Sequence, residues 1–248
     1  TAYMDSIPLV VMTGQVPTHL IGNDAFQEVD IVGITRPCTK HNYLVKQPRD
    51  LARILTQAFY IAKSGRPGPV LVSIPMDIFS MELDTRFFDM RIDNNPLLPK
   101  PGLDEKTAEE IAVMLAEAKH PILYPGGGVI SSGASQDLSA LATHLEIPVL
   151  YTLMGKGAIP DDHPLAVGMT GFWGTGFNNR TAMKADVMMA VGTRLSEADC
   201  SSWYFGETFD IPPTRLIHID INQEEIGRNF KTAIGAVCDA KMALGAIL

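Results

Sequence analysis

A short stretch of side chains suited to contacting a substrate follows the first apolar run of the chain. The run, Ile7 to Met12, predicts a buried strand, and Gly14-Gln15-Val16-Pro17-Thr18 predicts the loop after it. The stretch from Gly22 to Glu28 then places an aromatic ring, Phe26, beside an amide, Gln27. Ligands bind beyond the carboxyl ends of strands in open α/β sheets, so both residues are candidates for a site. The alternative is that Phe26 fills a core and Gln27 belongs to a turn.

A second group of candidates follows later apolar runs. These segments are Gly126-Gly127-Gly128, Thr152-Leu153-Met154-Gly155, Gly192-Thr193-Arg194 and Asp220-Ile221. Glycines let a backbone approach a phosphate with its amides free to donate, an arginine suits a diphosphate, and an acid after a strand accepts from ribose hydroxyls. Four such ends on one sheet edge predict a dinucleotide crevice. The alternative is that the glycines form a plain tight turn and the other segments are ordinary polar loops.

The elements that position these residues alternate between strands and helices, which predicts parallel sheets. Strands are expected at 69–74, 121–124, 148–152, 185–191, 215–219 and 234–237, and helices at 48–64, 107–118, 135–145 and after 237. The predicted fold class is α/β, with a partial parallel-sheet domain at 1–90 and a linker at 91–103. A doubly wound, roughly six-stranded parallel sheet is expected at 104–248.

The composition excludes several classes of function. A net charge of −8 and a pI near 5.2 provide no basic stripe for nucleic acid. No apolar run reaches the ~18 residues that a membrane span needs. Three scattered cysteines do not form a disulfide framework or a zinc site, and the histidines show no metal-binding spacing, so no metal ligand is assigned. A reducing compartment is expected, either the cytoplasm or an organelle.

Four sequence motifs, in this order along the chain, resemble motifs of one family. They are GQVPT, GNDAFQE, TKHNYLV and SGRPGPV, and they are similar to the large subunit of acetolactate synthase, within the thiamine diphosphate-dependent enzymes. The resemblance implies the second half of a pyrimidine-binding domain followed by a central domain. It also implies a parent enzyme that condenses or decarboxylates 2-oxo acids, such as pyruvate to 2-acetolactate in branched-chain amino acid biosynthesis.

The resemblance also implies site residues and cofactors. Thiamine diphosphate and Mg²⁺ belong to the parent, mostly through segments outside this chain, and the central domain of the family binds FAD. Phe26 and Gln27 carry over to the active-site entrance, where Gln27 would hydrogen-bond a reacting carbonyl or hydroxyl, whereas Lys40-His41-Asn42 is mostly framework in the family. The residues that carry over to the cofactor are Arg66, Gly126, Gly127, Gly128, Thr152, Leu153, Met154, Arg194, Asp220, Ile221, Glu225 and Asp239.

Three departures from the family pattern concern the substrate. Met76 stands where the family usually has lysine, and Ala198 stands where it has an arginine expected to face the substrate carboxylate. Phe172-Trp173 replaces a Met-His pair. Loss of two cations removes Coulombic partners for an anionic acceptor, so the acceptor of the parent is expected to differ from that of acetolactate synthase.

The resemblance leaves several alternatives open. The first alternative is that the parent is similar to glyoxylate carboligase or sulfoacetaldehyde acetyltransferase. The second is that the central domain is a nucleotide-binding module without a catalytic role. Because the catalytic glutamate and the Mg²⁺–diphosphate motif of the family are not in this chain, the chain alone is expected to be an inactive fragment. A homodimer or homotetramer is the expected assembly, and the family allows a regulatory subunit as a further partner.

Overall fold

The computed structural model describes residues 1–83 and 100–248, which fall into two compact units divided between these ranges. Most of the expected linker at 91–103 therefore lies outside the described residues. Thr1 to Met4, which resembles a helix end in sequence, forms turns. Within the described residues, no helix is both long and apolar enough to cross a membrane.

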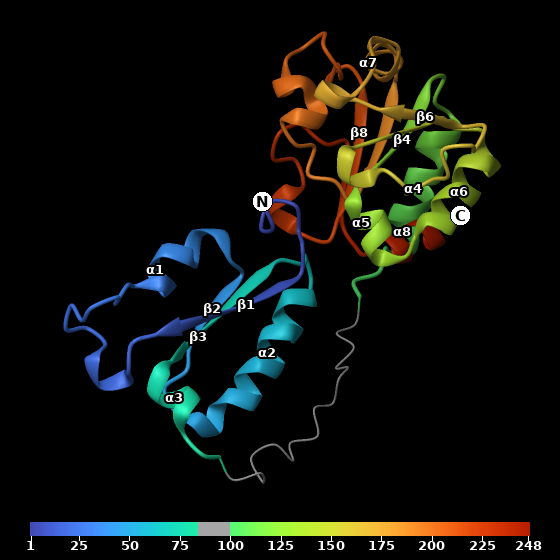
Figure 1. Cartoon of the computed structure of the whole chain (residues 1–248). Helices are drawn as coiled ribbons and strands as arrows, with labels where there is room; N and C mark the ends of the chain where they lie inside the picture. The colour runs from blue at the N-terminus through green and yellow to red at the C-terminus, as the bar shows by residue number, and fades with distance from the viewer. Residues whose placement is uncertain (84–99) are drawn as a thin grey trace. The chain divides into compact units, whose positions relative to one another are not determined.

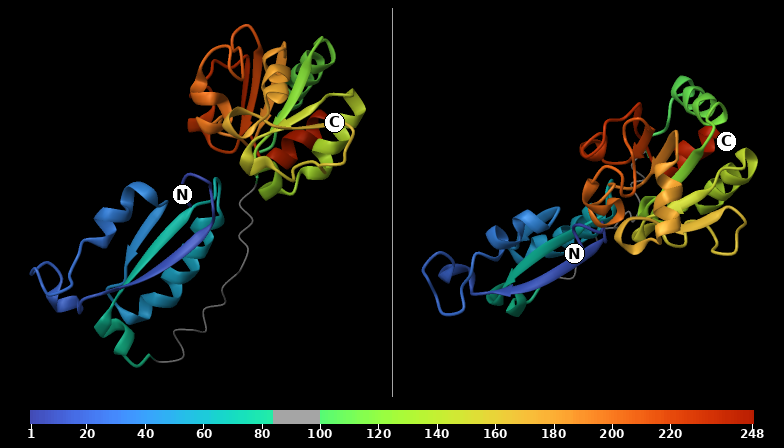
Figure 2. Two further views of the ribbon diagram at one scale, coloured as in Figure 1. Left: turned by 45° about the horizontal axis from the view of Figure 1, so that its top comes forward. Right: turned by 90° about the horizontal axis from the view of Figure 1, so that it is seen from above.

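The first unit contains a three-stranded parallel sheet in the order β1-β3-β2. Its strands are β1 (Leu9–Gln15), β2 (His41–Leu44) and β3 (Pro69–Pro75), and its helices are α1 (Ile31–Thr35), α2 (Leu51–Lys63) and α3 (Met76–Ser80). The central strand β3 is buried along its whole length, as its continuous apolar run predicts. Helix α2 runs alongside the strands (Figure 2) and packs Ile54, Ala58 and Ala62 against β3. The predicted start at Pro48 is wrong, because Pro48–Asp50 forms a 3₁₀ turn before α2.

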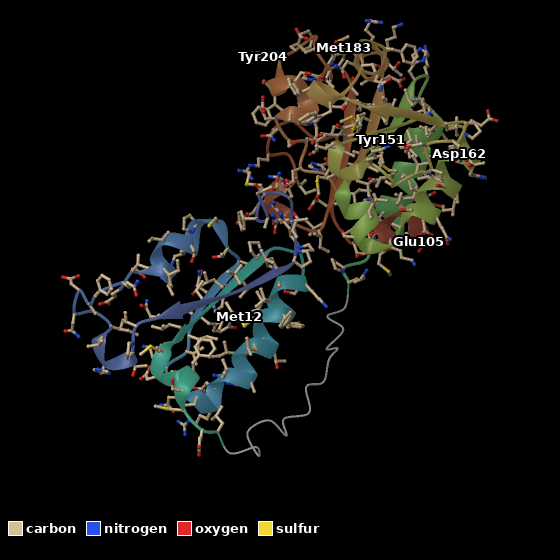
Figure 3. All side chains as sticks on the ribbon, viewed as in Figure 1. Met12, Glu105, Tyr151, Asp162, Met183 and Tyr204 are labelled. Carbon is tan, nitrogen blue, oxygen red and sulfur yellow. The ribbon has the colours of Figure 1, made fainter. Side chains whose placement is uncertain are left out.

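Strand β1 is an edge strand and is only partly covered. It pairs with β3 on one side, and no described strand pairs with its other side. Met12, labelled in Figure 3, is 63% exposed, and Leu9 is 43% exposed. The strand begins two residues later than predicted and continues to Gln15. The first sheet therefore presents an open edge with apolar side chains.

The second unit contains a six-stranded parallel sheet in the order β6-β5-β4-β7-β8-β9. The strands are β4 (Pro121–Pro125), β5 (Val149–Tyr151), β6 (Ala166–Met169), β7 (Val187–Val191), β8 (Arg215–Asp220) and β9 (Ile234–Val237). The chain starts in the middle, moves outward through β5 and β6, and then returns to build the other half. This is the doubly wound order, and its switch point lies between β4 and β7. The predicted α/β class with a six-stranded parallel sheet is confirmed.

Helices cover both faces of this sheet (Figure 1). They are α4 (Glu105–Ala116), α5 (Gly127–Ser132), α6 (Ser135–Leu145), α7 (Gly176–Met183) and α8 (Ala240–Ile247). Helices α4, α5, α6 and α8 share one core with Leu123, Val187 and Ile217. Helix α7 contributes Ala182 to the core on the opposite face, where Tyr124 and Phe209 are buried. Helix α4 begins at Glu105, before the predicted Thr107, because the Asp104 side chain accepts from the Thr107 N–H.

Candidate functional site

The switch point of the second sheet is closed by contacts between glycine backbones. The Gly126 N–H donates to the Val191 carbonyl at 2.9 Å, and the Gly128 N–H donates to the Gly192 carbonyl at 3.0 Å. A Cβ on Gly128 would lie 2.6 Å from the Gly192 Cα, and Gly192 itself has φ +59°. The glycine triplet is therefore no plain loop, because Gly127 opens α5 and the triplet packs against β7. The expectation that the triplet's amides are free is wrong for Gly126 and Gly128.

The segment after β5 lies against this glycine turn. Thr152 is buried, and its hydroxyl accepts from the Gly155 N–H at 2.9 Å, which closes the 3₁₀ turn Leu153–Gly155. A Cβ on Gly127 would meet the Met154 carbonyl at 3.2 Å, so the two predicted segments are in contact. Leu153 and Met154 remain 44% and 42% exposed. The structure thus places two apolar side chains beside the switch point.

Asp199 holds these loops together, and sequence reasoning missed it. Its side chain is buried, and it accepts from the Leu153 N–H at 3.1 Å and from the Ser196 hydroxyl at 2.5 Å. Its backbone carbonyl accepts from the Thr170 hydroxyl at 3.0 Å, and Thr170 bonds the Tyr124 hydroxyl at 2.6 Å. Burial raises the pKa of Tyr124 well above its usual range, so this hydroxyl stays protonated. No local signal identifies this role of Asp199, since Leu153 and Thr170, the residues it ties to its own segment, lie 46 and 29 positions away.

The ends of β7 and β8 supply the charged candidates. Asp220 ends β8 and is buried, and its carboxylate accepts from the Asn222 N–H at 2.9 Å. Glu225 is buried in the 3₁₀ turn Gln223–Glu225, and Arg228 approaches it to 3.4 Å. Arg194 and Ile221 are half-buried on the segments beside them. The four predicted strand ends, with Gly126, Thr152, Arg194 and Asp220, lie along one edge of the parallel sheet, and Asp239 follows β9 at the same edge.

His218 lies under this edge and serves the fold. It is buried on β8, and its Nε2 lies 2.8 Å from the Thr193 carbonyl, which requires Nε2 to be the donor. Burial lowers the pKa of His218, which favours the neutral ring that this bond uses. The histidine therefore fixes the position of the segment that carries Arg194.

Asp239, after β9, makes structural contacts in this unit. Its carboxylate accepts from the Lys241 and Met242 N–H groups and so caps α8. Lys100 forms an ion pair with it at 3.0 Å. The Asp239 N–H donates to the Pro101 carbonyl at 2.9 Å, and the Cys238 thiol lies 3.1 Å from that oxygen. Burial raises the pKa of Cys238 to about 11, so the thiol stays protonated. Contact between Asp239 and a cofactor stays a prediction.

The remaining candidates belong to the first unit. Phe26 is 90% exposed, so the alternative that it fills a core is wrong. Gln27 has φ +66°, which is the backbone of a turn. Arg66 precedes β3 and so lies at the amino end of the sheet, where it bonds the Ser6 hydroxyl and the Tyr3 and Met4 carbonyls. The structure therefore places Arg66 at the opposite end of the sheet from the loop after β1.

Side chains fix the loops at the carboxyl end of the first sheet. The Thr18 N–H and hydroxyl both donate to Asp77, at 3.1 and 2.5 Å. The Gln15 amide donates to the Val29 carbonyl at 2.9 Å. Lys40, by contrast, donates to the Ile61 and Ser64 carbonyls at 2.6 Å and so caps the end of α2, which makes it part of the framework here.

The carboxyl edge of the second sheet has the chemistry to hold a nucleotide. Half-exposed Leu153 and Met154 offer an apolar surface to a ring, and the Asp220 carboxylate at a strand end suits ribose hydroxyls. Arg194 carries the charge that suits a phosphate. Among the described residues, no cluster of three or more His, Cys, Asp or Glu side chains is arranged to hold a metal ion.

Comparison with known proteins identifies the family. Residues 108–247 match the central domain of thiamine pyrophosphate enzymes. All of the chain aligns with a probable acetolactate synthase large subunit of Methanocaldococcus jannaschii at 44% identity and with an acetolactate synthase of Arthrospira platensis at 40%, covering 42% and 43% of them. A large subunit from Corynebacterium glutamicum is 40% identical. The chain spans about two fifths of the length of these relatives. The resemblance seen in the four sequence motifs is confirmed. The chain belongs to the thiamine pyrophosphate enzyme family and carries its central domain.

Proposed function

We propose that the chain is part of a thiamine diphosphate-dependent enzyme that condenses or decarboxylates 2-oxo acids in the manner of acetolactate synthase. The observation that carries the proposal is the 44% identity to such a large subunit over the whole chain. Residues 1–90 would complete a pyrimidine-binding domain, residues 91–103 would connect it, and residues 104–248 would form the central domain.

Thiamine diphosphate supplies the electron sink that lets a 2-oxo acid lose carbon dioxide and form a new carbon–carbon bond. The chain's own residues position the second substrate. Phe26 offers an exposed ring and Gln27 an amide that donates to a carbonyl or accepts from a hydroxyl. Thiamine-dependent turnover of pyruvate by the parent enzyme, and none by this chain, is the expected result. A parent inactive on pyruvate, glyoxylate, sulfoacetaldehyde and oxalyl thioesters would contradict the proposal.

Product analysis separates the closest alternatives. Mass analysis of the products formed from pyruvate, glyoxylate and sulfoacetaldehyde distinguishes acetolactate synthase from glyoxylate carboligase and sulfoacetaldehyde acetyltransferase. A homodimer or homotetramer, with a regulatory subunit as a further partner, is part of the proposal. The open edge of β1 and its exposed Met12 support association.

The central unit is proposed to bind FAD along its carboxyl edge. We expect Leu153→Glu to weaken FAD binding at least about tenfold, because it puts a carboxylate on the apolar surface offered to the ligand's ring while the Leu153 N–H stays on Asp199. Equilibrium dialysis with flavin absorbance measures the change. Val113→Glu, at a similarly exposed position on α4, is the control and should leave binding unchanged.

If the purified chain shows no absorbance from bound flavin, and ADP raises its melting temperature, the result would favour a module that binds an adenine nucleotide instead. That outcome would support the second candidate function, in which the central unit binds a nucleotide without flavin. The same doubly wound edge supports both ligands, since both carry an adenosine diphosphate group. Equal Kd values for FAD in Leu153→Glu and in the unmutated chain would contradict the placement of the ligand.

The parent is expected to use 2-oxobutyrate-type acceptors poorly, or to prefer a different or less anionic acceptor. Met76, 61% exposed at the start of α3, and Ala198, half-buried at the start of a 3₁₀ segment, replace the two family cations. Charged contacts in a desolvated site are worth ~2–5 kcal/mol on truncation. The Met76→Lys, Ala198→Arg double variant should therefore raise the use of 2-oxobutyrate at least about tenfold in acceptor competition. A parent that already forms acetohydroxybutyrate with ordinary efficiency would show that the departures are neutral.

A further inference from the structure

The loop of residues 22–28, which presents Phe26 and Gln27, has a shape that burial does not explain. Phe26 is 90% exposed, so its ring anchors the loop to no core. Three residues of the loop have left-handed backbone, namely Gly22 at φ +89°, Asp24 at +53° and Gln27 at +66°. This conformation is unfavourable for a residue with a Cβ, and two of the three have one. Specific bonds must therefore hold the loop in place.

The Glu28 carboxylate supplies these bonds. Its Oε1 accepts from the Gly22 N–H, and its Oε2 accepts from the Ala25 N–H at 2.9 Å. The Glu28 N–H in turn donates to the Ala25 carbonyl at 2.9 Å. One side chain thus bridges amides six and three residues earlier and closes the loop around itself. Bonds of this kind require an ionised carboxylate, and they hold the pKa of Glu28 below its usual value.

Contacts outside the loop fix its ends and one internal residue, Asn23, whose side-chain amide donates to the His19 and Leu20 carbonyls and whose N–H donates to the Leu20 carbonyl at 3.1 Å. Gln15 bonds the Val29 carbonyl, and Asp77 bonds Thr18. Both contacts would remain if Glu28 were replaced. Asp24 and Gln27 would then be free to return to ordinary backbone angles, which would turn Phe26 and the Gln27 amide to new directions.

We propose that Glu28 is a positioning residue that holds Phe26 and Gln27 in the orientation in which they meet the second substrate. The inference rests on the proposed function, which gives Phe26 and Gln27 that role. Because the pKa of Glu28 is lowered in the folded loop, its contribution is complete above the range in which an ordinary glutamate titrates. The contribution is lost as the pH falls through the lowered pKa of Glu28.

The geometry can be tested by NMR on the chain itself. In the unmutated chain, the amide protons of Gly22 and Ala25 should shift together with a midpoint below that of an ordinary glutamate. Glu28→Gln should abolish this titration and speed hydrogen exchange of the two amides about tenfold, since a charged acceptor is lost. Asp24→Asn removes the same charge from the same loop, and asparagine tolerates left-handed backbone, so it should change neither. The inference would be overturned if the titration and exchange rates of the two amides were unchanged in Glu28→Gln, or if Asp24→Asn changed them equally.

A double-mutant cycle in the parent enzyme tests the positioning. We expect Glu28→Gln to lower kcat/KM for the acceptor about tenfold and to have almost no further effect when Gln27→Ala is already present. If the fold losses in kcat/KM of the two single variants multiplied in the double variant, Glu28 would not act through Gln27. A parent without thiamine-dependent turnover would overturn the proposed function, whereas the amide titration would still decide whether Glu28 holds the loop.

Discussion

Replacing Gly128 by alanine is expected to lower the free energy of unfolding of the second unit by about 3 kcal/mol. The new Cβ would lie 2.6 Å from the Gly192 Cα and 2.9 Å from its carbonyl oxygen. Both neighbours are backbone, so relief requires the loops after β4 and β7 to separate. The gain in helix propensity, at most about 1 kcal/mol, does not offset this clash.

Chemical denaturation followed by tryptophan fluorescence measures the loss. Both tryptophans, Trp173 and Trp203, lie in the second unit, so the signal reports that unit. Gly245→Ala is the matched control, because a Cβ there meets nothing within 4 Å inside α8. The control should be neutral or slightly stabilising. If Gly128→Ala changed stability no more than Gly245→Ala does, the close contact at the switch point would not exist in solution.

The largest effect of removing a polar side chain is expected at Asp199. Asp199→Ala should cost about 3 kcal/mol, because it leaves the Leu153 N–H and the Ser196 hydroxyl without their acceptor inside the protein. The same substitution should loosen the turn that carries Leu153 and Met154. Urea unfolding gives the free energy, and hydrogen exchange at the Leu153 amide gives the local effect.

Asp199→Asn separates the hydrogen bonds from the charge. Asparagine keeps a carbonyl oxygen for the Leu153 N–H and can donate to the Ser196 oxygen, so most of the stability should return. Asp162→Ala, at an exposed position, should stay within about 0.5 kcal/mol of the unmutated chain. A loss at Asp199→Ala no greater than at Asp162→Ala would mean that the buried network contributes little.

The strands that the sequence predicted most directly are those with continuous apolar runs, such as β3 and β7. Strand β6 was missed because it is a half-buried edge strand with Gly168 at φ +131°. Helix α7 was missed because Asn178, Asn179 and Arg180 break its apolar face. It depends instead on the Thr175 cap and on the Asn178 amide, which donates to the Met169 carbonyl. Strand β6 is held by its pairing with β5, and α7 by its cap and by a bond nine positions away, and neither shows as an apolar pattern in the sequence.

The site likewise contains residues that a sequence pattern predicts and residues that only the folded structure brings together. Strand-end reasoning predicted that Gly126, Thr152 and Asp220 share an edge, because every strand of a parallel sheet ends on the same side. It gave no indication of Asp199, whose bond to Leu153 joins residues 46 positions apart. It also missed Glu28, although its partners are near in sequence, because the left-handed residues that let the loop close around Glu28 carry no glycine signal at Asp24 or Gln27.

The bonds between residues 100–101 and 238–239 have a consequence for how the second unit can be joined to other sequences. The Cys238 thiol and the Pro101 carbonyl are 137 positions apart, yet they are in contact, and Lys100 pairs with Asp239 next to them. The backbone thus enters the second unit and leaves its last strand, β9, at one point. A module whose first residues lie beside the start of its last helix is suited to insertion between other domains.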